Sequence, residues 1–157
     1  MVETFNNEGT QAFLAVHQTE SLAILAFRGT EATKKKDIMA DIKLLLVEQG
    51  SYKIHGGFKA AFDQVKADVK KALAKFPKHS LYITGHSLGG ALAIIATQYF
   101  ENDYTAACYT FGSPKVASEE FGDDIKTPIY RVVNTADVVP RMPGTLFMEI
   151  GLDLLGF

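Results

Sequence analysis

The chain has 157 residues, of which 47% are hydrophobic and 22% are charged, and this globular composition argues against general disorder. Its length fits one domain that can bury a core without a metal or a disulfide. Sixteen Lys and Arg against eighteen Asp and Glu leave a net charge of −2, and there is one cysteine, which disfavours a nucleic-acid partner and excludes an intramolecular disulfide and a multi-cysteine zinc cluster.

The first elements expected along the chain are two apolar runs that form a β-hairpin. They are Gln11–His17 and Ser21–Phe27, separated by the polar residues 18–20. The second run is apolar at nearly every position, as in a strand that is covered on both faces. The polar segment 31–41 is either a short helix or a surface segment, and the apolar stretch 42–47 fits more than one element type.

After residue 55, helix and strand patterns alternate. Apolar residues recur at three- or four-residue spacing from Phe58 to Phe76, which predicts an amphipathic helix. The later elements expected are strands, one long apolar helix and one short helix: Ser80–Thr84, Leu88–Phe100, Thr105–Phe111, 116–124 and Ile129–Asn134. This alternation predicts an α/β fold with a mainly parallel sheet and helices on both faces. In such a sheet, ligands bind at the carboxyl ends of the strands.

A Gly-x-Ser-x-Gly sequence, Gly85-His86-Ser87-Leu88-Gly89, follows the expected strand Ser80–Thr84. A serine nucleophile lies on a tight, strained strand-to-helix turn, where side chains on the flanking glycines would collide with neighbouring backbone. The next helix points its N-terminal amides at the developing negative charge. A glycine-rich turn with an incidental serine would read the same in isolation. The strand before the motif and the apolar helix after it favour the nucleophile elbow.

Five blocks in register resemble a known family. They are LAFRGT, IHGGF, GHSLGGALA, YTFGSPKV and NTADVVPRMP. In this order and spacing they resemble the fungal-lipase-like, or class 3, lipase family, and the resemblance extends from about Thr10 to Phe157. It implies an α/β-hydrolase fold and action on acylglycerols and other carboxylic esters.

The resemblance also implies roles for single residues. Ser87 is the expected nucleophile, and the backbone N–H of Leu88 forms half of the oxyanion hole. Thr30 supplies the other oxyanion donors, although its position alone is more typical of a helix N-cap or a strand-end turn. Asp137 is the acid in a Ser–Asp–His order, while an aspartate ahead of Pro140 is also typical of a turn.

Asp41 and His86 are expected beside the reacting groups, without taking part in the reaction. The resemblance implies that Asp41 supports the oxyanion loop by hydrogen bonding. His86 is a usual elbow residue, and its side chain is expected to point into the fold. Residues 31–40 occupy the place of the family's lid, but the stretch EATKKKDIMA has only two large apolar residues. This composition speaks against interfacial activation and leaves only transient contact with a lipid surface.

A serine hydrolase of this kind needs an imidazole base, and no histidine follows Asp137. The four histidines are His17, His55, His79 and His86. His55 matches a non-catalytic family position, and His17 and His79 are expected at the surface. We therefore expect residues 1–157 to form a single hydrolase domain that lacks its C-terminal part and has low activity. The missing sheet elements would leave an exposed strand edge that favours a dimer or a swapped assembly.

Three functions are consistent with these residues. The first is a lipase or esterase that acylates Ser87 and takes an acylglycerol or another ester as substrate. The alternatives are a non-catalytic binding module on a hydrolase scaffold, which the lack of a late histidine favours, and an acyl transferase.

The sequence predicts no cofactor and no metal site, and Cys108 reads as a small core residue. No signal peptide is visible before Phe13, and no apolar run is long enough to span a membrane. The compartment is left open between secreted and cytoplasmic.

Overall fold

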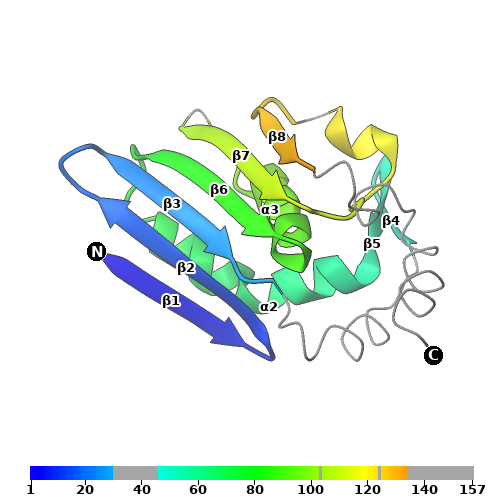
Figure 1. Cartoon of the computed structure of the whole chain (residues 1–157), viewed down its shortest axis with the longest axis horizontal. Helices are drawn as coiled ribbons and strands as arrows, with labels where there is room; N and C mark the ends of the chain where they lie inside the picture. Colours follow the sequence, from blue (N-terminus) through cyan, green and yellow to red (C-terminus); the bar gives the residue numbers. More distant parts are fainter. Residues whose placement is uncertain (30–45, 103, 124, 134–157) are drawn as a thin grey trace.

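The central feature of the computed structural model is a six-stranded sheet (Figure 1). The structure describes residues 1–29, 46–102, 104–123 and 125–133. The strand order is β1-β2-β3-β6-β7-β8. The first three strands pair antiparallel, and the pairs from β3 onward are parallel. The strands are β1 (Val2–Asn7), β2 (Thr10–His17), β3 (Leu22–Phe27), β6 (Ser80–His86), β7 (Thr105–Phe111) and β8 (Ile129–Val132).

Two α-helices, a small hairpin and one 3₁₀ turn complete the described fold. The hairpin is β4 (Leu46–Gln49) with β5 (Tyr52–His55), and the helices are α2 (Gly56–Leu73) and α3 (Leu88–Tyr99). Both helices lie behind the sheet in the view of Figure 1. No helix among the described residues is long and apolar enough to cross a membrane.

The core lies between the sheet and these two helices. Leu14, Leu25 and Ile83 are in register across β2, β3 and β6, and each is fully buried. The buried side of α2 has the three- and four-residue spacing of an amphipathic helix, and its residues are Phe58, Phe62, Val65, Val69 and Ala72. Full burial of each large apolar side chain contributes about 1.5–3 kcal/mol, so this interface fixes the sheet against the two helices.

The opposite face of the sheet carries exposed apolar side chains, including Phe13, Ile24, Tyr109 and Tyr130. The expectation that Ser21–Phe27 is covered on both faces is therefore wrong, because Ile24 is 37% exposed. Strand alternation places Ile24 on the side away from the helices. The expected α/β sheet is confirmed, and within the described residues both long helices cover the same face.

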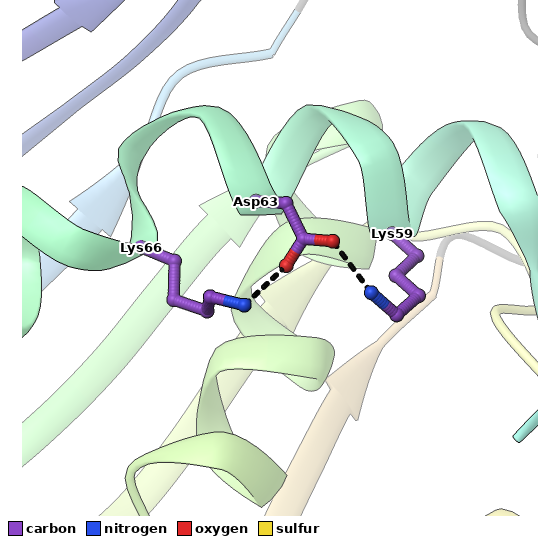
Figure 2. Close-up of polar contacts among 3 residues, drawn as sticks. All are labelled: Lys59, Asp63 and Lys66. Carbon is purple, nitrogen blue, oxygen red and sulfur yellow. Dashed lines mark hydrogen bonds and ion pairs between the residues drawn. The ribbon is translucent and has the colours of Figure 1, made fainter.

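The solvent-facing side of α2 carries a small charged cluster, shown in Figure 2. Asp63 forms ion pairs with Lys59 and Lys66, which lie four residues before it and three residues after it. The Lys66 Nζ is 2.8 Å from the Asp63 carboxylate. Such pairs stabilise an exposed helix by a few tenths of a kcal/mol each, so this cluster supports α2 without shaping the fold.

Most of the expected elements are present, with shifted ends. The hairpin, the long amphipathic helix, the apolar helix and the three later strands are all confirmed. β1 is absent from the sequence expectations, because Phe5 is the only buried residue in it. The helix expected over 116–124 is a single 3₁₀ turn, Glu119–Gly122. Residues 31–45 lie outside the described residues.

Candidate active site

Ser87 lies at the junction between β6 and α3. This is the carboxyl end of a parallel strand, where α/β sheets bind their ligands. Its backbone has φ 54° and ψ −123°, a conformation that is strained for any residue with a side chain. Ser87 makes no side-chain capping hydrogen bond to α3, unlike an ordinary serine N-cap. The turn therefore presents the hydroxyl at the carboxyl end of β6, as a nucleophile elbow does.

Glycines make this turn sterically feasible. A Cβ on Gly85 would come closer than 3.0 Å to the backbone of Gly89, and a Cβ on Gly89 would come equally close to the Phe27 carbonyl. A Cβ on Gly90 would lie 2.7 Å from the Ser113 Cβ. Real Cβ atoms essentially never approach so closely, so the Gly-x-Ser-x-Gly-Gly pattern follows from the contact between α3 and the strands.

Hydrogen bonds fix the backbone of Ser87 on both sides. Its N–H donates to the Phe111 carbonyl at 2.9 Å, and its carbonyl accepts the Gly90 N–H at 2.9 Å. The first bond ties the elbow to the end of β7, and the second begins the helix. These two contacts hold the strained conformation against relaxation.

The first turn of α3 supplies amides near Ser87. Leu88 is the first residue of this helix, and the first N–H groups of a helix have no partner within it. The helix has no acidic residue in its first turn, so the positive end of its dipole is not cancelled there. The Leu88 N–H therefore belongs to the first turn of the helix that follows the serine, which is where a nucleophile elbow has one of its oxyanion-hole amides.

The end of β3 also reaches the elbow. A Cβ on Gly29 would lie 2.6 Å from the His86 carbonyl oxygen and 3.7 Å from the Ser87 Cβ. This contact was not anticipated, although the glycine in FRGT was its visible signal. The neighbouring residue Thr30 lies outside the described residues, as do Asp41 and Asp137.

His86 is exposed, so the expectation that its side chain points into the fold is wrong. β6 continues as far as His86, and strand alternation buries Gly85 and turns the next residue outward. Within the described part of the chain, no histidine side chain is hydrogen-bonded to Ser87. The exposed His17 agrees with its surface expectation, whereas His79 is only half-exposed.

His55 is the buried histidine. It precedes α2, its ring stacks on Phe58 with centroids 4.3 Å apart, and it is 2% exposed. Its Nδ1 is buried without a partner among the described residues. Burial lowers the pKa of His55, which favours the neutral ring. This packing identifies His55 as a core residue.

Two further features lie away from Ser87. Cys108 is buried, burial raises the pKa of its thiol, and a hydrogen bond with Thr97 opposes this rise, so it is a core residue as expected. A cavity of about 340 Å³ is lined by residues that include Ala23 and Leu81. These are the second residues of β3 and β6, so the cavity lies at the end of the sheet opposite the elbow. The described residues contain no cluster of three or more His, Cys, Asp or Glu side chains able to hold a metal ion.

Known proteins match this chain over most of its length. The family model for Lipase (class 3) matches residues 24–147. The secreted mono- and diacylglycerol lipase 1 of Fusarium solani is 36% identical over 102 residues, covering 60% of this chain and 31% of that protein. The lipase of Rhizomucor miehei is 28% identical over 154 residues, covering 88% of this chain and 42% of that protein. The chain thus spans less than half the length of these relatives.

Solved structures show the same fold. Lipase II from Rhizopus niveus superposes with a TM-score of 0.75 at 27% identity, covering 92% of this chain and 61% of that one. A triacylglycerol lipase whose catalytic centre is formed by a serine protease triad gives a TM-score of 0.75 at 26% identity, with the same two coverages.

Proposed function

The chain belongs to the class 3 lipase family, and we propose that it is a carboxylic-ester hydrolase in which Ser87 is the nucleophile. The observation that carries this proposal is the Ser87 backbone, held at φ 54° between glycines that touch neighbouring backbone. Backbone strain of this kind costs on the order of 1–3 kcal/mol and persists where function requires it. An incidental serine in a loose turn would relax to an ordinary conformation.

In the proposed reaction the Ser87 Oγ attacks the ester carbonyl carbon. The hydroxyl proton leaves to a base and is returned to the departing alcohol, and an acyl-enzyme remains. Water then attacks the acyl carbon, which releases the carboxylic acid and restores the serine. The Leu88 N–H and the donors of Thr30 stabilise the oxyanion, with Asp41 supporting Thr30. Asp137 is the carboxylate that would orient the base.

Acylglycerols are the proposed substrates, because two of the proteins named above are a mono- and diacylglycerol lipase and a triacylglycerol lipase. We infer that residues 1–157 hydrolyse esters slowly, since every histidine precedes Asp137. Serine hydrolases that lack a triad member retain about 10³–10⁴ over water from the oxyanion hole and binding. Within the described residues no histidine side chain is hydrogen-bonded to Ser87, and this favours the second candidate function, a non-catalytic binding module on a hydrolase scaffold.

Covalent labelling of Ser87 tests the proposal independently of turnover. The purified chain is incubated with diethyl p-nitrophenyl phosphate, and the diethylphosphoryl adduct is located by peptide mass spectrometry while p-nitrophenolate release is followed. We expect slow labelling at Ser87 and none in Ser87→Ala. The matched control is Ser80→Ala, which changes a serine at the other end of β6. Labelling no faster in the parent chain than in Ser87→Ala would refute a nucleophilic Ser87 and support the binding module.

A further inference from the structure

Arg131 is an exposed residue of β8 whose side chain reaches the turn that follows β7. Its Nη2 donates a partly buried 2.8 Å hydrogen bond to the Ser113 carbonyl. The backbone of Arg131 pairs with Thr110, so its side chain extends to a peptide three residues further along. Because the donor is charged, this bond belongs to the stronger class of protein hydrogen bonds.

The turn held by this bond, residues 111–113, also supports the nucleophile. The carbonyl of Phe111 accepts the Ser87 N–H. Ser113 is 1% exposed, and its Cβ occupies the space beside Gly90 that a larger residue would need. Gly90 in turn donates to the Ser87 carbonyl. The turn therefore contacts the elbow on both sides of Ser87.

Two bonds tie this turn to β8. The Gly112 N–H donates to the Val132 carbonyl at 3.0 Å, which fixes the start of the turn. Gly112 has φ 55°, and glycine at such a position leaves the following peptide free to rotate. The Arg131 side chain holds the next peptide along, which carries the Ser113 carbonyl. Loss of the guanidinium would release the end of the turn that packs on α3.

We propose that Arg131 is a positioning residue that holds the Ser87 turn in its strained conformation from β8. It acts through Ser113 and does not touch the ester. This role rests on the proposed function only in that Ser87 is the group being positioned.

Amide hydrogen exchange, measured by NMR on the full chain, tests the proposal without any turnover. In Arg131→Gln we expect exchange at the Ser87 and Gly90 amides to accelerate about tenfold or more, because a hydrogen bond from a charged group is lost. Amides of the β2–β3 ladder should keep their exchange rates. Arg131→Lys, which retains a charged donor, should restore at least part of the protection.

The control is Lys115→Gln, which removes an exposed positive charge next to the same turn and should leave all these amides unchanged. Unchanged exchange at Ser87 in Arg131→Gln would overturn the proposal, and so would equal acceleration across the whole sheet, which signals global destabilisation. Absence of Ser87 labelling in the parent chain would refute the proposed function but would not alter this exchange result.

Discussion

Gly85 lies directly against the carbonyl group of Gly89 across the turn that carries Ser87. The obstacle to a Cβ at Gly85 is backbone, which cannot move away as the end of a flexible side chain can. Gly89 is confined in the same way by the carbonyl of Phe27. The elbow is thus closed by three backbone segments in contact: the end of β6, the first turn of α3 and the end of β3.

We expect Gly85→Ala and Gly89→Ala each to lower the free energy of unfolding by about 1–3 kcal/mol or more, because overpacking usually costs this much. The urea midpoint measures the loss. Gly122→Ala is the matched control, because a Cβ there meets nothing within 4 Å. Midpoints of Gly85→Ala or Gly89→Ala that match the Gly122→Ala midpoint would mean that the turn is not closely packed.

Strain at Ser87 gives a second prediction. Glycine tolerates φ 54° without the penalty of a Cβ, which costs other residues about 1–3 kcal/mol, whereas its extra freedom in the unfolded chain offsets about 0.5–1 kcal/mol. In urea titrations, the free energy of unfolding of Ser87→Gly should therefore be about 1 kcal/mol higher than that of Ser87→Ala. Both variants lack the hydroxyl, so diethyl p-nitrophenyl phosphate should not label residue 87 in either of them. Equal stability of the two would show that the turn stores no strain.

The elbow could be anticipated from sequence because its requirements are local. The strand, the five-residue motif and the apolar helix follow one another along the chain. Each glycine of the motif marks a position where the turn has no room for a side chain. The support from Ser113 and Arg131 could not be anticipated, since it depends on which strands become neighbours in the sheet. The side-chain direction of His86 does not follow from its place in the motif: β6 continues two residues beyond the expected end at Thr84, and its alternation turns His86 outward.

The same reasoning explains which features of the fold the sequence does not predict. β1 has one buried residue, Phe5, and pairs with β2 on one side only, so its sequence carries almost no apolar alternation. The exposed residue of β3, Ile24, is as apolar as its buried neighbours. Only the position of α2 and α3 decides which face of the strand is covered. Thr30, Asp41 and Asp137 stay predictions, because they lie outside the described residues.

The charged cluster on α2 predicts a weak, salt-dependent stabilisation. Burial alone would raise the pKa of Asp63, but hydrogen bonds and charges from Lys59 and Lys66 outweigh it and lower the pKa. The Asp63 side chain is 35% exposed, so solvent screens both pairs. Asp63→Asn should lower the free energy of unfolding by about 0.5 kcal/mol or less in dilute buffer. The difference should vanish in 1 M NaCl, and a loss that persists there would point to packing instead of charge.

His55 predicts the pH dependence of stability near neutrality. Its pKa in the fold is lowered from the ordinary value of 6.5 because burial disfavours the charged ring. Between these two values the unfolded chain binds more protons than the folded chain, so the free energy of unfolding rises with pH. Stability present above pH 6.5 should thus be lost as the pH falls toward the folded pKa. Urea midpoints between pH 7 and pH 5 should fall in the parent chain and in His17→Gln, which changes an exposed histidine. They should fall less in His55→Gln, and an unaltered slope in that variant would assign the effect to another group.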